Sequence, residues 1–232
     1  MTQFSLPQEH SIQLNICEKT TVTLICTDEA LRPLIVGFLY NEGLIQCPAD
    51  IARLEISSDH LRAEVSLPDC PEIPDASIRP TGLGGRQLAA AVPLSHGAGR
   101  GQYSLNDICK CASAMDTQAV RYAQTGGMHC SALFDDCGQL GLFEDVGRHN
   151  TLDKLAGKCL LEGTLAEEAL LVTTGRISSD MICKAIRLGA CVVASYSIPT
   201  QAAYELAAVS GITLIGYLKR KPTIYTFSER IR

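Results

Sequence analysis

The feature that most constrains the fold is a set of three short, almost entirely apolar segments near the C-terminal end of the chain. They are ALLVTT (169–174), ACVVAS (190–195) and ITLIG (212–216). The first two are each followed by a polar turn and a segment with helical start and stop signals. Apolar strands joined by helical crossovers are typical of a parallel sheet covered by helices on both faces. The sequence therefore predicts an α/β fold.

The N-terminal residues have a different pattern, which predicts a smaller α+β part. Four segments alternate apolar and polar side chains, or read as paired hairpin arms, as half-buried strands do. These segments are 11–17, 20–26, 51–57 and 61–67. Between the two pairs, Asp28 is placed to cap a helix and Gly43 to end it, although Pro33 is awkward unless the regular helix begins at about residue 32.

A stretch rich in proline and glycine separates the two patterns and predicts a linker or mobile loop, since irregular stretches of this length are usually functional or disordered. After it, Ser104 is placed to cap a helix, and residues 130–145 predict a further hairpin. The predicted organisation is therefore an N-terminal α+β part (1–75), a Gly/Pro-rich mobile loop (76–103) and an α/β domain (104–232).

Composition and charge exclude several classes of function. The net charge of −5 argues against a general nucleic-acid binder. No apolar run approaches the roughly 20 residues of a membrane span, and the N-terminus lacks a signal-peptide pattern, so we expect a cytoplasmic protein that does not enter a membrane. The eleven cysteines include no CxxC pair, and Cys109 and Cys111 would point apart on a helix. No metal site is predicted.

Polar residues that suit an anion follow each of the three apolar strands. In open parallel sheets, ligands bind outside the carboxyl ends of the strands, where helix N-termini offer free N–H groups. The candidate binding residues are Arg176, Ser178 and Ser179 after the first strand, Thr200 after the second, and Lys219, Arg220 and Lys221 after the third. Taken singly, Ser178 and Thr200 could merely cap helices. Their convergence predicts a site for a phosphate-bearing ligand, such as a nucleotide.

Two further polar segments lie next to predicted strands. One carries His129, and the other, EDVGRHN (144–150), carries Arg148 and His149. The carboxylates Glu144 and Asp145 could hold a guanine edge, a ribose or a proton, or could equally serve as helix caps with an exposed ion pair. A histidine can do acid–base work near neutral pH, but no nucleophile is fixed beside either one.

These motifs together identify a family. TGGMHCSALFD (125–135), EDVGRHNTLDKLAGK (144–158), TTGRISSDMICKA (173–185) and TLIGYLKRKPTIYT (213–226) resemble the formate dehydrogenase accessory protein family, FdhD. The resemblance also includes LIVGFLYNEGLI (34–45) and SYSIPTQAAYELA (195–207). It implies a cytidine-deaminase-like three-layer α/β/α core without the zinc ion.

The resemblance also implies a function. Family members transfer sulfur from a cysteine desulfurase to the molybdenum cofactor of formate dehydrogenase, as cytoplasmic homodimers. They hold molybdopterin guanine dinucleotide as cargo, at the segment that corresponds here to Tyr217, Leu218, Lys219, Arg220, Lys221 and Pro222.

One departure bears on the chemistry. Leu83 stands where the family's persulfide cysteine is expected, and a leucine cannot carry sulfur because transfer needs a thiolate. The candidate substitutes are Cys70 and Cys130. The alternative hypothesis is a non-catalytic, cofactor-binding chaperone that has lost this cysteine. A deaminase-like hydrolase is disfavoured, because the sequence lacks the zinc-ligand pattern of the deaminases.

Overall fold

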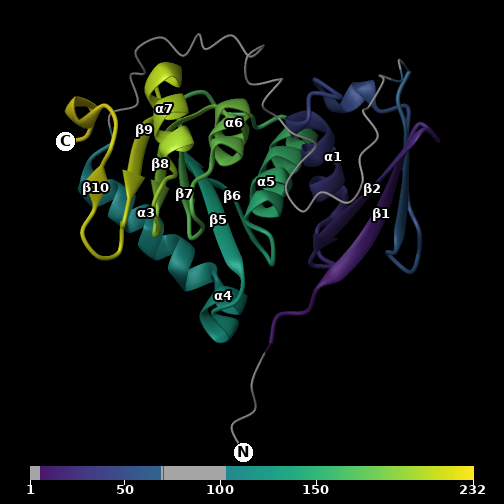
Figure 1. The fold of residues 1–232 in the computed structure, drawn as a ribbon, viewed down its shortest axis with the longest axis horizontal. Helices are drawn as coiled ribbons and strands as arrows, with labels where there is room; N and C mark the ends of the chain where they lie inside the picture. Colours follow the sequence, from purple (N-terminus) through teal and green to yellow (C-terminus); the bar gives the residue numbers. More distant parts are fainter. Residues whose placement is uncertain (1–5, 69, 71–102) are drawn as a thin grey trace, which may run out of the picture.

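The protein contains two β-sheets with helices packed between them (Figure 1). This computed structural model describes residues 6–68, 70 and 103–232. Most of the predicted loop at 76–103, including Leu83, lies outside the described residues. No helix within the described ranges is long and apolar enough to cross a membrane.

The larger sheet has six strands in the order β10-β9-β8-β7-β5-β6. Its strands are β5 (His129–Asp135), β6 (Gly138–Asp145), β7 (Ala169–Thr173), β8 (Ala190–Ser195), β9 (Thr213–Gly216) and β10 (Thr223–Ile224). The three apolar strands β7, β8 and β9 are parallel, as predicted. The β5–β6 hairpin runs antiparallel to β7, and β10 is a two-residue antiparallel edge strand.

Helices cover both faces of this sheet, so the predicted α/β/α layering is present. On one face lies α3 (Leu105–Gln118), followed by the short α4 (Val120–Thr125). On the other face lie α5 (Arg148–Glu162), α6 (Ser179–Arg187) and α7 (Gln201–Ser210). The hydroxyls of Ser104, Ser178 and Thr200 cap α3, α6 and α7, because each accepts a hydrogen bond from an N–H of the first turn.

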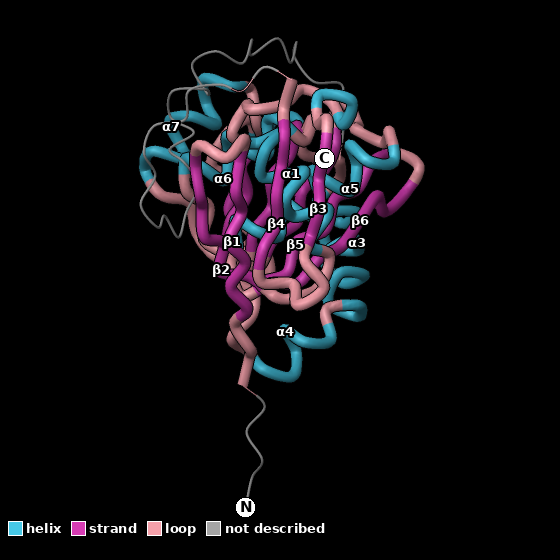
Figure 2. Tube along the Cα trace, turned by 90° about the vertical axis from the view of Figure 1, so that its right-hand side faces the viewer, coloured by secondary structure: helices cyan, strands magenta, loops and turns pink. Residues whose placement is uncertain are grey.

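The smaller sheet is formed by the N-terminal strands and faces the viewer in Figure 2. Its order is β2-β1-β4-β3, with β1 (His10–Ile16), β2 (Thr20–Cys26), β3 (Arg53–Ile56) and β4 (Arg62–Ser66). Both predicted hairpins are confirmed. Strands β1 and β4 join them in a parallel pair, which period-two patterns cannot predict because the partners are far apart in sequence. Two single-turn helices complete the described elements: Pro48–Asp50, which precedes β3, and Ser228–Arg230, which follows β10.

The N-terminus of α1 (Leu31–Asn41) differs from the prediction. Asp28 does not cap this helix; its N-cap residue is Ala30, which has a left-handed backbone and makes no side-chain cap. Pro33 is the third residue of the helix and is tolerated there, because the N–H groups of a first turn have no partner within the helix.

Helices α1 and α5 lie side by side between the two sheets (Figure 1) and cross at two glycines. A β-carbon on Gly37 would lie 1.7 Å from the carbonyl oxygen of Asp153, and one on Gly157 would lie 1.8 Å from the carbonyl oxygen of Pro33. The backbones can approach this closely only because neither residue has a side chain. This crossing joins the N-terminal part to the larger sheet and positions the first turn of α5.

Candidate functional site

The loops that leave the carboxyl ends of β7, β8 and β9 are hydrogen-bonded to one another. Ile177 N donates to Ile198 O (3.1 Å), and Thr200 N donates to Ile177 O (2.8 Å). Tyr217 N donates to Ser197 O (2.9 Å). The three strand ends therefore converge at one edge of the sheet, as the sequence predicts.

Gly175, in the loop after β7, is the point at which two predicted binding residues meet. A β-carbon on Gly175 would lie 3.0 Å from Cβ of Arg148 and 3.3 Å from Nδ1 of His129. Arg148 is the first residue of α5, and His129 is the first residue of β5. The missing side chain at Gly175 thus lets the arginine and the histidine pack against the loop that carries Arg176.

One side-chain nitrogen of each of these two residues is buried without a hydrogen-bond partner among the described residues. These atoms are Nε of Arg148 and Nδ1 of His129. Burial lowers the pKa of the Arg148 guanidinium, and the nearby charge of Arg176 lowers it further, opposed by Asp180. Burial and the charge of Arg148 also lower the pKa of His129. A positive site with unused donors is suited to an anion, and an arginine fork matches phosphate geometry.

His149 lies next to this pair. Its ring is 5 % exposed, and its Nε2 lies 3.4 Å from the hydroxyl of Ser178. Burial first, and then the charges of Lys184 and Arg148, lower the pKa of His149 to about 3. The ring is therefore neutral at pH 7 and offers a hydrogen bond rather than a charge. We refer to His129, Arg148, His149 and Arg176 as the rim cluster.

Hydroxyl groups beneath the rim cluster fix the loop that carries Gly175. Ser195 Oγ donates to Gly175 O (2.7 Å), and Gly175 N donates to Thr173 Oγ1 (3.3 Å). Ser131 Oγ bonds both Thr173 Oγ1 (2.9 Å) and Thr151 Oγ1 (2.7 Å), which links β5, β7 and α5. Thr151 Oγ1 also donates to Arg148 O (2.7 Å), so the network holds the loop while using no side chain of the rim cluster.

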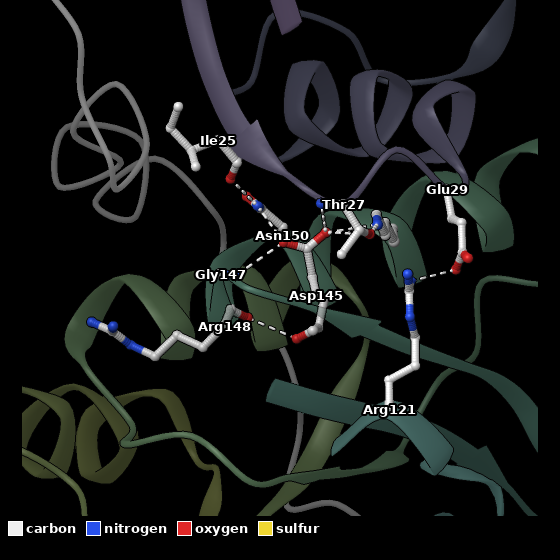
Figure 3. Close-up of polar contacts among 10 residues, drawn as sticks. Ile25, Thr27, Glu29, Arg121, Asp145, Gly147, Arg148 and Asn150 are labelled. Atoms are coloured by element: carbon white, nitrogen blue, oxygen red, sulfur yellow. Dashed lines mark hydrogen bonds and ion pairs between the residues drawn. The ribbon is translucent and has the colours of Figure 1, made fainter. Parts of the chain in front are cut away.

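Asp145, at the end of β6, is a structural residue (Figure 3). It is fully buried and lies 2.6 Å from Nζ of Lys154. It also accepts hydrogen bonds from Asn150 Nδ2 (2.8 Å), Gly147 N (2.9 Å), and the backbone N (3.1 Å) and hydroxyl (3.2 Å) of Thr27. We call Thr27, Asp145, Asn150 and Lys154 the interior cluster. Figure 3 shows the Arg148 side chain pointing away from it.

Two further carboxylates, those of Asp153 and Glu144, are also engaged in contacts within the protein. Asp153 lies 2.5 Å from Nζ of Lys184 and accepts from Asn41 Nδ2 (2.7 Å), which ties α1, α5 and α6 together. Glu144 accepts hydrogen bonds from the backbone N–H groups of Arg121 (3.2 Å) and Tyr122 (2.5 Å) at the start of α4. Of the two interpretations of the acidic pair Glu144 and Asp145, the structural one holds, but the ion pair of Asp145 is buried rather than exposed.

The segment 217–222 forms a turn after β9, and its Lys219 is paired with residues away from the rim cluster. Its ammonium lies 2.8 Å from Asp116 of α3 and 4.1 Å from the centre of the Tyr196 ring. Leu218 is buried in the core on the α3 face, whereas Arg220 and Lys221 are exposed. Within the described residues, no hydrogen bond or ion pair joins this turn to Arg148 or Arg176.

The remaining predicted binding residues have mixed surroundings. Arg176 is exposed, and Ser179 and Pro222 are partly exposed. Thr200 caps α7 and also lines a shallow pocket with Pro199, Gln201, Tyr204 and Tyr225. The structure therefore brings His129, Arg148, His149, Arg176 and Ser178 together. The backbone of Thr200 bonds the same loop at Ile177, although its hydroxyl caps α7. Among the described residues, the 217–222 turn makes no hydrogen bond or ion pair with Arg148 or Arg176.

The two candidate sulfur carriers differ sharply. Cys130 is buried in β5, and burial, with Glu144 and Asp116 nearby, raises its pKa to about 12. A buried thiol that stays protonated is a poor nucleophile. Cys70 is partly exposed, and its thiol is hydrogen-bonded with that of Cys17. Among the described residues, no group of three histidine, cysteine or acidic side chains could hold a metal ion.

Sequence reasoning missed the residues that shape the site. Gly175 contributes the space that its missing side chain leaves for Arg148. Ser195 and Thr173 read as the polar ends of apolar strands, and only their position at one sheet edge reveals their shared network.

Comparisons with known proteins agree with this architecture. The sequence profile of the FdhD/NarQ family matches residues 7–232. The sulfur carrier protein FdhD of Bacillus subtilis is 34 % identical over 230 residues, covering 91 % of this chain and 84 % of the relative. That of Halalkalibacterium halodurans is 32 % identical over 237 residues, covering 97 % and 87 %.

The fold also matches a solved structure. A crystal structure from Desulfotalea psychrophila, described as a formate dehydrogenase accessory protein, aligns with a TM-score of 0.76 at 23 % identity. The alignment covers 98 % of this chain and 90 % of that one. At this identity the match supports the fold, while the family profile and the closer relatives establish the kinship. The chain therefore belongs to the FdhD/NarQ family.

Proposed function

We propose that this protein is an accessory factor for formate dehydrogenase that binds molybdopterin guanine dinucleotide and assists its sulfuration. The observation that carries the proposal is the rim cluster, where Arg148 and His129 bury polar atoms that have no partner among the described residues. A diphosphate supplies oxygens that accept from such donors and neutralise the repulsion between Arg148 and Arg176.

The rim cluster fits the pyrophosphate of the dinucleotide better than it fits a neutral ligand. Arg148 and Arg176 would hold the phosphates, and the neutral imidazole of His149 would donate or accept one hydrogen bond, according to its tautomer. The exposed Arg220 and Lys221 of the 217–222 turn remain available for a more distant part of the ligand. When bound, the cofactor supplies the molybdenum centre that receives the sulfur.

The names of the relatives supply the rest of the proposal. The Bacillus and Halalkalibacterium proteins are called sulfur carriers, and the Desulfotalea protein a formate dehydrogenase accessory protein. We accordingly propose formate dehydrogenase as the client, a cysteine desulfurase as the sulfur donor, and a cytoplasmic homodimer as the working form.

Nucleotide binding tests the pocket directly. Titration calorimetry with GDP should show that Arg148→Ala or Arg176→Ala weakens binding about 10- to 100-fold, because a hydrogen bond to a charged group is worth about 1.5–3 kcal/mol. The matched control is Arg53→Ala, an exposed arginine of β3 in the other sheet, which should bind as the wild type does. Unchanged affinity in both rim variants would show that the phosphates bind elsewhere.

A binding-only chaperone is the second candidate, because Leu83 occupies the expected carrier position and the Cys130 thiol is buried. Incubation with a cysteine desulfurase and cysteine, followed by intact mass spectrometry, separates the two candidates. A protein heavier by one sulfur atom supports the carrier function. Neither added sulfur nor release of hydrosulfide through the protein, with GDP binding retained, would leave only the chaperone.

A further inference from the structure

Two cysteines that are distant in the sequence of the N-terminal half lie beyond the C-terminal ends of neighbouring strands of the smaller sheet. Strands β1 and β4 are parallel neighbours, so their C-terminal ends emerge together. Cys17 directly follows β1, and its N–H donates to the carbonyl of Val65 in β4 (2.8 Å). Cys70 follows β4 by four residues. Neither cysteine is close to the other in sequence, so only the pairing of the two hairpins brings them together.

The two thiols are in contact. Cys70 and Cys17 are hydrogen-bonded through their side chains, which raises the pKa of the Cys70 thiol, and the ammonium of Lys19 beside Cys70 opposes that rise. Both residues are partly exposed. A disulfide has sulfur atoms about 2 Å apart, so thiols that already share a hydrogen bond need little movement to form one.

The surroundings give the two cysteines different roles. Cys17 sits in a tight turn with a left-handed backbone (φ 53°) and packs against the N-terminal core. Cys70 belongs to none of the hydrophobic cores formed by the described residues. Where a thiol packed against a core lies beside one outside it, the outer thiol can meet an external donor and the core-packed thiol can then displace what has been added.

We propose that Cys17 and Cys70 form a two-thiol site in which Cys70 accepts a sulfane sulfur from a donor persulfide and Cys17 releases it as hydrosulfide. The inference rests on the proposed carrier function and names the cysteines that perform it. It places the sulfur chemistry on the N-terminal sheet rather than at position 83.

The chemistry balances in two exchanges. The Cys70 thiolate attacks the outer sulfur of a donor R–S–SH; the donor S–S bond breaks, R–S⁻ leaves, and Cys70 becomes Cys70–S–SH. The Cys17 thiolate then attacks Sγ of Cys70, forming the Cys17–Cys70 disulfide and expelling HS⁻. The sulfane sulfur gains two electrons and the two thiols lose them. An external dithiol reductant resets the site.

Four of the other thiols are less suited to this step. Burial raises the pKa of Cys26 and of Cys130 to about 12, and that of Cys183 and of Cys191 to about 11. These four thiols remain protonated near neutral pH. Cys137, in the exposed β5–β6 turn, offers a matched accessible cysteine for comparison.

The experiment uses the full chain, reduced and freed of reductant, with a cysteine desulfurase and cysteine. Intact and peptide mass spectrometry locates added sulfur, and a thiol-trapping dye quantifies hydrosulfide. The wild type should end as a Cys17–Cys70 disulfide, lighter by two hydrogens, with one hydrosulfide released per chain. Cys17→Ser should instead accumulate a persulfide on Cys70. Cys70→Ser should take up sulfur at least tenfold more slowly, and Cys137→Ser should behave as the wild type does.

The failure of this inference differs from the failure of the carrier function. If Cys17→Ser/Cys70→Ser takes up sulfur as fast as the wild type, the carrier function stands and the two-thiol site is wrong. If the wild type forms neither a persulfide at any cysteine nor the Cys17–Cys70 disulfide, and releases no hydrosulfide above the level of the desulfurase alone, both are wrong. GDP binding by each variant checks that it is folded, since the rim cluster lies on the other sheet.

Discussion

The interior cluster and the rim cluster both take residues from the segment 145–154, yet the charges of that segment are paired in one cluster and, among the described residues, unpaired in the other. Asp145 and Lys154 are buried and paired, and Asp145 accepts from four further donors, from Thr27, Gly147 and Asn150. Arg148, between them in sequence, has a buried nitrogen without a partner among the described residues and lies near a second arginine. The difference supports the proposal that the interior cluster serves stability and the rim cluster serves binding.

The largest expected effect is on the interior cluster. Lys154→Met leaves the Asp145 carboxylate buried without its cation, so we expect a loss of about 3–5 kcal/mol in the free energy of unfolding. Lys158→Met, one turn later in α5, removes a half-exposed ion pair with Glu162 and should lose less than about 1 kcal/mol. Denaturant unfolding of the two variants measures the difference, and equal losses would remove the distinction between buried and exposed pairs.

An intermediate effect is expected from His149 as the pH falls. Its folded pKa of about 3 lies below the ordinary histidine value, so the unfolded chain binds a proton that the folded protein does not. Above about pH 6.5, His149 therefore contributes nothing to the pH dependence of the free energy of unfolding. As the pH falls from there toward 3, the free energy of unfolding decreases by about 1.4 kcal/mol per pH unit because of this group.

The variant His149→Gln isolates that contribution. The difference in unfolding free energy between the wild type and the variant should be constant above about pH 6.5 and should decline as the solution becomes more acidic. Parallel stability curves from pH 7 to pH 4 would show that His149 is not held neutral by its surroundings.

The smallest expected effect is on stability at the rim. Arg148→Met removes a desolvated charge without breaking an ion pair, so the free energy of unfolding should change by no more than about 1 kcal/mol, and the sign favours the variant. Thermal unfolding checks this. A loss as large as that of Lys154→Met would place Arg148 in the structural framework with the interior cluster.

Much of the fold could be predicted because local patterns encode it. The strands β7, β8 and β9 are recognised from their own apolar residues. The hydroxyls of Ser178 and Thr200 cap helices that begin at the next residue. The failures are non-local or depend on exact backbone geometry. Asp28 has a capping side chain, yet the backbone turns into α1 at Ala30, and the contact of Cys17 with Cys70 depends on two hairpins pairing in parallel.

The site was partly predictable for the same reason. Strand ends and a helix start are visible in sequence, so Arg148, Arg176 and His129 were identified as candidates. The burial of a side chain cannot be inferred from these sequence patterns. It distinguishes Asp145, which is buried and fully paired, from Arg148, which has a buried nitrogen without a partner among the described residues. The ion pair of Lys219 with Asp116 joins residues 103 positions apart and could not be inferred from either segment alone.

The central claim is that the rim cluster recognises phosphate, and a comparison of two ligands tests it most directly. GDP and guanosine differ only in the diphosphate, so calorimetry of both with the wild type and with Arg148→Met measures how much Arg148 contributes to phosphate recognition. We predict that the preference for GDP over guanosine falls about tenfold or more in the variant, while guanosine binding is unchanged. An undiminished preference for GDP would contradict the assignment of the phosphates to the rim cluster.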